Sequence, residues 1–231
     1  MSALVITESR NRLGKRDGDE FKREASRMWS WWAEQENIAD CALHDVGTAS
    51  KAEKQSRVLG AISSVRALDR VAFFCHGTSR GISLGFSVDN IAILADALAG
   101  AAGPVLHVGL YACLTGRGAF FGGAKNKKNT GYRCESVVTA REGFAMLLCS
   151  ELKKRGVSAE ITAHLTSGHT TKNPYKVRVS PTNGDIMRVR LCDNTPRDKW
   201  IKWCEKLDAD PVFRYTIMME DAKPFSMSDY L

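Results

Sequence analysis

The chain has 231 residues, of which 44% are apolar and 26% are charged, and its formal net charge is +7. A chain with this apolar content can bury a core, so disorder over most of its length is excluded. Its 19 glycines and 6 prolines are too few for a low-complexity or collagen-like protein. The length indicates one large domain or one domain with an appendage, and the positive charge favours an acidic partner or an anionic ligand.

The seven cysteines indicate free thiols in a reducing compartment, because their spacing is irregular and no CxxC pair is present. Without such pairs a zinc ribbon is not expected. The first ten residues lack the basic and apolar regions of a secretory signal, so we expect a cytoplasmic protein. The apolar stretch 91–114 contains Asp96, Pro104 and His107, which favours a buried helix and a buried strand over a membrane span.

Apolar periodicity predicts strands and helices that alternate along the first 165 residues. Short apolar runs predict strands at 3–7, 38–46, 70–75, 104–112 and 157–165. Apolar residues at helical spacing predict helices at 19–36, 50–68, 88–101 and 139–155. This alternation predicts an α/β fold with a mostly parallel sheet and helices on both faces. The third and fourth strands are apolar on both faces, which is typical of the centre of such a sheet.

Two helices carry more specific expectations. In the helix at 19–36, Trp29 and Trp31 are expected to extend the apolar face that packs on the core. The helix at 88–101 is preceded by Ser87 and contains Asp89 near its start, and either residue is a plausible N-cap.

The last quarter of the chain differs in pattern, and we divide the sequence into a domain over 1–170 and a C-terminal part over 171–231. The segment 175–191 predicts a β-hairpin with a three-residue loop, which places Arg178 opposite Arg188 and puts the valines on the other face. A short helix is predicted at 197–207. Both elements are expected to pack on the same domain.

Two central strands end in residues suited to nucleophilic catalysis. The third strand ends in Cys75, His76 and Gly77, and the fourth ends just before Cys113. If these strands are neighbours, the His76 imidazole and the Cys113 thiol emerge side by side at the carboxyl edge of the sheet. A thiol beside an imidazole is the basic requirement of a cysteine nucleophile, and the backbone N–H groups of Gly77 and Cys113 are candidates for an oxyanion hole.

The segments FFCHGT (73–78) and LYACLTG (110–116) resemble the caspase-like cysteine peptidases of clan CD. In that clan an apolar strand ends in His-Gly, and after a helix a second apolar strand ends in Ala-Cys. The second segment is closest in style to the bacterial CHAT proteases, separase and the metacaspases. The resemblance covers residues 3–165 and implies a cysteine endopeptidase with Cys113 as nucleophile, His76 as general acid/base and Gly77 in the oxyanion hole. This chemistry needs no metal and no cofactor.

The resemblance leaves the substrate preference open. Caspases carry Gln two residues before the catalytic Cys, whereas this chain has Tyr111, so a preference for aspartate is not implied. The substrate pocket of caspases also contains an arginine from the loop after the first strand, whereas clan members that cut after Lys or Arg use acidic pocket residues. Both Arg16 and Asp17 occur in this part of the chain, so both are candidates for contacting the substrate. His164 and His169 flank the loop after the fifth strand and are candidates for lining the substrate pocket.

Other functions are consistent with the same residues. A caspase-like fold that has lost activity would serve as a binding module, and the basic hairpin would bind nucleic acid or an acidic protein, although a charged edge strand needs no ligand. The basic loop 114–135, which follows Cys113, is a candidate site of self-processing or a gate. The expected partner is a protein or peptide substrate, with nucleic acid not favoured, no membrane association, and the oligomeric state left open.

Overall fold

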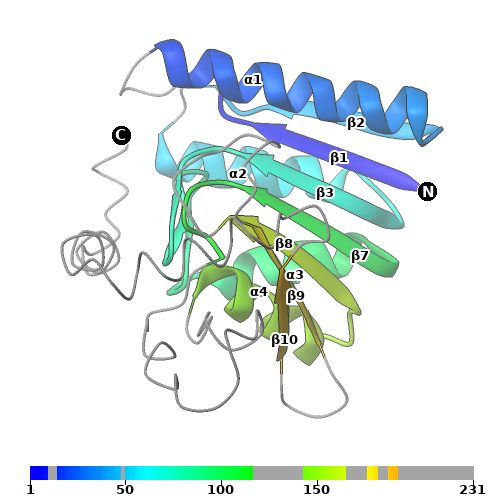
Figure 1. The fold of residues 1–231 in the computed structure, drawn as a ribbon, viewed down its shortest axis with the longest axis vertical. Coiled ribbons are helices and arrows are strands. Elements are labelled where there is room, and N and C mark those ends of the chain that lie inside the picture. The colour runs from blue at the N-terminus through cyan, green and yellow to red at the C-terminus, as the bar shows by residue number, and fades with distance from the viewer. Residues whose placement is uncertain (10–14, 48–49, 117–142, 165–175, 182–186, 192–231) are drawn as a thin grey trace.

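A computed structural model describes residues 1–9, 15–47, 50–116, 143–164, 176–181 and 187–191 (Figure 1). The helices are α1 (Lys15–Ser30), a π-helical turn (Trp31–Gln35), α2 (Lys51–Ser63), α3 (Ile91–Ala101) and α4 (Phe144–Lys154). The strands of the main sheet are β1 (Ser2–Thr7), β2 (Asp40–Asp45), β3 (Leu68–Phe74), β7 (Ala102–Tyr111), β8 (Ala159–His164), β9 (Lys176–Pro181) and β10 (Met187–Leu191). A small second sheet is formed by β4 (Gly77–Thr78), β5 (Gly81–Ile82) and β6 (Phe86–Ser87).

The main sheet has seven strands in the order β10-β9-β8-β7-β3-β1-β2. Its strands β2, β1, β3, β7 and β8 are parallel, while β9 runs antiparallel to β8 and β10 antiparallel to β9. The predicted α/β fold with a mostly parallel sheet is therefore confirmed. The two strands predicted to be apolar on both faces, β3 and β7, are neighbours within the sheet. Residues 71–74 of β3 are buried on both faces, as expected. On β7 the expectation is wrong for one face, because Leu106, Val108 and Leu110 are buried whereas Val105 and His107 are exposed on the other side.

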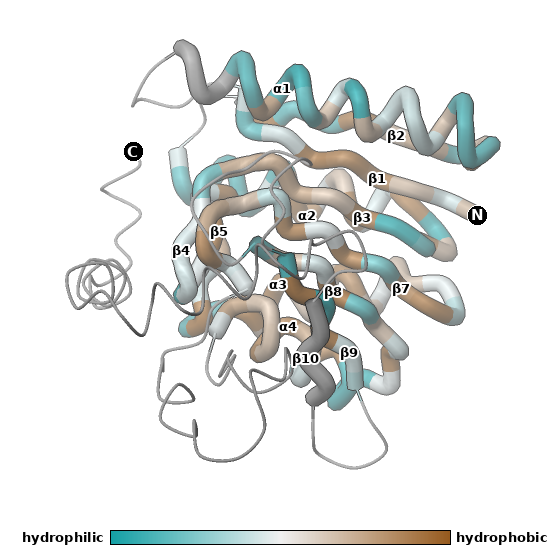
Figure 2. Tube along the Cα trace, in the orientation of Figure 1, coloured by the Kyte–Doolittle hydropathy of each residue, from teal (hydrophilic) through white to brown (hydrophobic). Residues whose placement is uncertain are grey.

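Helices lie on both faces of the sheet. Successive residues of each strand point to opposite sides, so one strand contributes to the core on each face. On β1, Leu4 and Ile6 join a core with residues of α2, α3 and α4, whereas Ala3 and Val5 pack with Phe21 of α1 on the other face. Figure 2 shows hydrophilic residues along much of α1 and apolar residues along β1 beneath it. Among the residues that the structure describes, no helix combines the length and apolar content needed to cross a membrane.

The expectation for Trp29 and Trp31 is wrong. The buried residues of this helical segment include Phe21, Ala25 and Trp32, while Trp29 and Trp31 are 36% and 56% exposed. Their indole N–H groups bind at the surface instead, Trp29 to the carbonyl of Cys41 at 2.9 Å and Trp31 to a carboxylate oxygen of Glu36 at 3.0 Å. Aromatic content alone did not distinguish the core stripe from its flanks.

The boundaries of α2 and α3 also differ from the expectation. Helix α2 ends at Ser63 and not at 68, because Ala67 takes a positive φ of 51° and Leu68 already belongs to β3. Helix α3 begins at Ile91, with Asn90 as its N-cap residue in place of Ser87 or Asp89. The Asn90 side chain accepts from the backbone N–H of Ser87 at 2.7 Å, which orders the turn before the helix.

The predicted register of the last two strands is wrong by two residues. Arg178 lies opposite Arg190 and not Arg188, which pairs with Ser180, so five residues (182–186) separate β9 and β10. A shift of two residues keeps every side chain on its original face, and the apolar pattern therefore cannot distinguish the two registers. Because β9 also pairs with β8, this part of the chain extends the same sheet. The helix predicted at 197–207 lies outside the described residues.

Candidate active site at the carboxyl edge of the sheet

The ends of β3 and β7 meet at the carboxyl edge of the sheet. In the parallel register of these strands Phe74 lies opposite Tyr111, and their rings stack with centroids 4.6 Å apart and planes 7° from parallel. Continuing this register by two residues brings the His76 and Cys113 positions to the same level. Both positions lie just beyond the last residues of their strands, and the His76 ring is on the α1 side of the sheet, where it contacts Phe21. The tertiary structure thus places the two strand ends that carry His76 and Cys113 side by side.

A close backbone approach joins the two strand ends. A Cβ atom added at Gly77 would lie 2.8 Å from Ala112 Cβ, 2.8 Å from Thr115 Cγ2 and 2.9 Å from the carbonyl oxygen of Cys113. Two of these atoms, Ala112 Cβ and the Cys113 carbonyl oxygen, are fixed by the backbone of the neighbouring turn, so they cannot move away as the end of a flexible side chain would. Glycine is therefore required at position 77 for the His76 loop to lie directly against the Cys113 loop.

Replacing Gly77 with alanine is expected to destabilise the fold by about 1–3 kcal/mol, because the added methyl group forces the two loops apart. The measurement is the urea midpoint followed by circular dichroism. Gly60→Ala is the matched control, since nothing lies within 4 Å of a Cβ added there on α2. That control should gain about 1 kcal/mol from helix propensity. Equal effects of the two substitutions would show that the loops do not approach this closely.

The backbone of His76 is held by Ser83. The hydroxyl of Ser83 accepts from the N–H of His76 at 3.1 Å, and the N–H of Ser83 donates to the carbonyl of His76 at 3.0 Å. The latter bond makes Gly77 and Ile82 a non-hydrogen-bonded pair of the β4–β5 ladder, so the N–H of Gly77 points away from β5. The half-buried His76 ring meets the Phe21 ring edge-on, with centroids 4.9 Å apart.

The turn that carries Cys113 is tied to two other elements. Leu114 takes a positive φ of 60°, which turns the chain sharply after the half-buried Cys113. The N–H of Gly116 donates to the carbonyl of His164 at the end of β8 at 2.8 Å. The N–H of Ala145 in the first turn of α4 donates to the carbonyl of Thr115 at 3.2 Å. The position of the thiol is therefore determined by β8 and α4 as well as by its own strand.

Two other thiols are buried in the core on the side of the sheet that α2, α3 and α4 cover. Cys75 is fully buried in the core beneath α2, α3 and α4, and burial together with the nearby Glu8 carboxylate raises the pKa of its thiol well above the ordinary value. Burial raises the pKa of Cys149 to about 12. Because the thiolate is the reactive form, both side chains are poor nucleophiles.

Iodoacetamide at pH 8 should therefore label Cys113 in the native protein and leave Cys75 and Cys149 unmodified until urea is added. With a pKa of about 12, only about one Cys149 in ten thousand is a thiolate at that pH. Mass spectrometry of the cysteine peptides over time measures the three rates. Labelling of Cys75 as fast as Cys113 would mean that Cys113 is the wrong choice of nucleophile.

The predicted substrate residues fall into different places. The expectation that Arg16 and Asp17 lie in the loop after the first strand is wrong, because α1 begins at Lys15 and includes both. The helix starts four residues earlier than its apolar pattern indicated, and this segment contains no proline that would prevent the earlier start. His164 is fully buried, with its ring edge-on to Tyr111 at 5.7 Å, which is inconsistent with direct lining of a substrate pocket. His169 and the basic loop after Gly116 lie outside the described residues.

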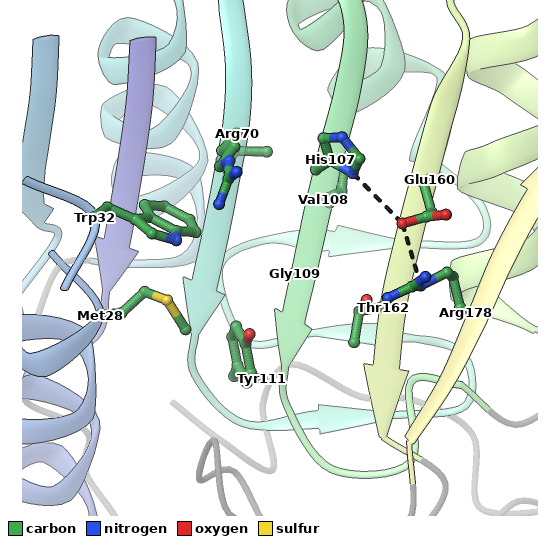
Figure 3. Close-up of a pocket in the computed structure, with 11 residues that line it drawn as sticks. Met28, Trp32, Arg70, His107, Val108, Gly109, Tyr111, Glu160, Thr162 and Arg178 are labelled. Carbon is green, nitrogen blue, oxygen red and sulfur yellow. Dashed lines mark ion pairs between the residues drawn. The ribbon is translucent and has the colours of Figure 1, made fainter. Parts of the chain in front are cut away.

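Tyr111 lines a cavity of about 380 Å³ on the sheet face between α1 and β9. Figure 3 shows Tyr111 at the carboxyl end of this cavity, with Arg70 on β3 and His107 on β7 nearer the amino ends of their strands. Its walls also contain Met28, Trp32, Val71, Val108, Gly109, Glu160, Thr162 and Arg178. The Glu160 carboxylate lies 3.1 Å from Arg178 Nε and 3.5 Å from His107 Nδ1. Because Tyr111 is the last residue of β7, the cavity ends beside the strand end that precedes Cys113.

Sequence reasoning missed a buried charged group behind the His76 loop. Glu8 follows β1 and is fully buried, as is Lys54 of α2, whose Nζ donates to a Glu8 carboxylate oxygen at 2.5 Å. The hydroxyl of Ser83 donates to the second oxygen. Burial raises the pKa of the Glu8 carboxyl, while the hydrogen bonds from Lys54 and Ser83 lower it in part. The one available signal was a charged residue directly after an apolar strand, and it does not identify a partner 46 residues away.

Comparisons with known proteins add no family to these observations: no protein-family model matches the sequence, and no curated protein matches it. The geometry of the strand ends therefore carries the functional argument.

Proposed function

We propose that the protein is a cysteine endopeptidase of the caspase-like type, with Cys113 as the nucleophile and His76 as the general acid/base. The observation that carries this proposal is the approach of the two strand ends, where glycine at position 77 allows the His76 loop to lie against the Cys113 turn. The β3–β7 register supports the same pairing.

In the proposed reaction the Cys113 thiol gives its proton to His76, and the thiolate attacks the carbonyl carbon of the scissile peptide bond. The N–H groups of Gly77 and Cys113 stabilise the oxyanion of the tetrahedral intermediate. The imidazolium of His76 then protonates the leaving amine as the C–N bond breaks, which leaves a thioester on Cys113. Water, deprotonated by His76, attacks the thioester, and release of the acid product restores the thiol.

The direction of the Gly77 amide supports its part in this reaction. An oxyanion donor must not be used by a strand ladder, and the pairing of Gly77 with Ile82 directs that N–H away from β5. The Phe21 ring against His76 restricts the imidazole on the α1 side. Tyr111 is proposed to contact the substrate, since it lines the cavity that ends at this edge.

The test uses peptidyl acyloxymethyl ketones that differ only in the P1 residue, with Asp, Arg, Lys or Leu at that position. We expect at least one probe to alkylate Cys113, with no detectable reaction in His76→Ala, as measured by intact mass and peptide mapping. The preferred P1 residue decides between acidic and basic specificity. If no probe reacts faster with the wild type than with His76→Ala, the protein is not a peptidase of this type.

The alternative of a basic hairpin that binds an anion has less support. Arg178 and Arg190 lie opposite each other in β9 and β10, which requires a neutralising charge nearby. The carboxylate of Glu160 on β8 supplies such a charge to Arg178 at 3.1 Å. An external polyanion is therefore not needed to explain the arginine on β9.

A further inference from the structure

Three buried polar side chains form a connected group behind the candidate active site, which we call the Glu8 network: Glu8, Lys54 and Ser83. Their exposed fractions are 0%, 2% and 1%. They come from three separate elements, namely the end of β1, the helix α2 and the segment after β5. One oxygen of the Glu8 carboxylate accepts from Lys54 and the other from Ser83, so both of its oxygens are engaged.

This network ends on the backbone of His76. The Ser83 hydroxyl has one proton, which it donates to Glu8, so a lone pair remains to accept the N–H of His76 at 3.1 Å. The Ser83 N–H donates in turn to the carbonyl of His76 at 3.0 Å. The backbone N–H of Glu8 also donates to the carbonyl of Phe74, two residues before His76, at 3.1 Å. The carboxylate thereby orients a serine that holds both backbone polar groups of His76.

A buried ion pair is a weak source of stability, because desolvation of the two charges offsets most of their attraction, and apolar residues of similar volume often replace such a pair without loss. An apolar replacement would nevertheless leave the Ser83 hydroxyl without its acceptor and free to rotate. The network provides an orientation that an apolar core lacks. The network ends at the backbone of His76, so His76 is the residue whose orientation depends on it.

We propose that the Glu8 network positions His76 for proton transfer with Cys113, so that Glu8, Lys54 and Ser83 are positioning residues of the catalytic dyad. This inference rests on the function proposed above. The three residues act through the His76 backbone and do not touch substrate. Loss of the Ser83 hydroxyl releases one side of the His76 peptide and lets the imidazole move relative to the thiol.

The test compares Ser83→Ala with Ser87→Ala, a matched change in the same small sheet whose hydroxyl accepts from the N–H of Asp89 at 3.3 Å. The first readout is the rate of Cys113 alkylation by iodoacetamide between pH 5 and 10, measured by mass spectrometry of the Cys113 peptide. We expect the midpoint in Ser83→Ala to shift toward that of His76→Ala, while Ser87→Ala retains the wild-type profile. On a cleavable peptide, kcat of Ser83→Ala should fall about tenfold with KM changed less than twofold.

The outcomes distinguish failure of the positioning role from failure of the peptidase proposal. A folded Ser83→Ala with the wild-type alkylation profile, alongside a shifted His76→Ala, overturns the positioning role and leaves the peptidase proposal intact. A wild-type profile in His76→Ala overturns the peptidase proposal, and the positioning role with it. If Ser83→Ala does not fold, the double variant Glu8→Leu with Lys54→Met replaces it, because it retains the volume while removing both charges and the acceptor of the Ser83 proton. An unshifted profile in the folded double variant then overturns the positioning role.

Discussion

Peptide hydrolysis should disappear in Cys113→Ala and fall by roughly 10³-fold or more in His76→Ala. Alanine at position 113 removes the atom that forms the acyl intermediate, and alanine at position 76 removes the group that accepts and returns the proton. The measurement is the initial rate on the peptide substrate that the P1 probe series identifies. The free energy of unfolding of each variant should lie within about 1 kcal/mol of the wild-type value, because each replaced side chain is only half-buried.

The control for this pair is Cys75→Ala, which removes a neighbouring thiol that interacts with Ser83 and Glu8 and leaves both side chains of the dyad in place. Cys75 lies in the core on the side of the sheet opposite Phe21 and His76, so kcat should remain within twofold of the wild type. Loss of the buried sulfur should cost about 1–2 kcal/mol of stability. Near-wild-type turnover in Cys113→Ala, or inactivity in a folded Cys75→Ala, would contradict the assignment of the nucleophile.

Lys54→Ala should lower the free energy of unfolding by about 3–5 kcal/mol at pH 7, because it leaves the Glu8 carboxylate buried without its countercharge. Urea denaturation followed by tryptophan fluorescence measures the change. Burial already raises the pKa of Glu8, so the carboxyl takes up a proton more readily in the folded protein than in the unfolded chain. The penalty of an unpaired carboxylate is therefore present at higher pH, and it shrinks as the pH falls through the folded pKa of Glu8.

Two variants control for the loss of a lysine and for the loss of side-chain volume. Lys51→Ala removes an exposed lysine from the first turn of the same helix and should change stability by less than about 0.5 kcal/mol. The double variant Glu8→Leu with Lys54→Met removes both charges and should recover most of the loss. A double variant no more stable than Lys54→Ala would show that packing, and not the unpaired charge, causes the destabilisation.

The elements themselves were predictable from the sequence wherever one physical signal dominated. The runs at 70–75 and 104–112 are short and mostly apolar, which favours strands with a buried face, and only β3 is buried on both faces. That signal located β3 and β7, and with them the residues His76 and Cys113 that follow. The alternation of strands and helices likewise indicated a mostly parallel sheet.

Signals that repeat or compete were not decisive. The apolar alternation of β9 and β10 repeats every two residues, so it predicted the faces and missed the register by two. The tryptophans of α1 and of the π-helical turn are apolar and also carry an N–H donor. Only the packing of Trp32 in the core decided that Trp29 and Trp31 lie outside. His164 is fully buried, and its ring meets that of Tyr111 on the neighbouring strand β7, a contact that the local sequence does not predict.

The sequence by itself determined which strands end in a histidine and a cysteine, because that information lies in short consecutive segments. The tertiary structure decided that those strands are neighbours, that Gly77 closes the distance between their ends, and that Glu8 meets Lys54 and Ser83. Each of these contacts joins residues far apart in the chain, and a pair separated by 46 or 75 residues has no common local pattern. Such contacts arise only when the whole sheet has formed, because the pairing of the strands sets which side chains meet.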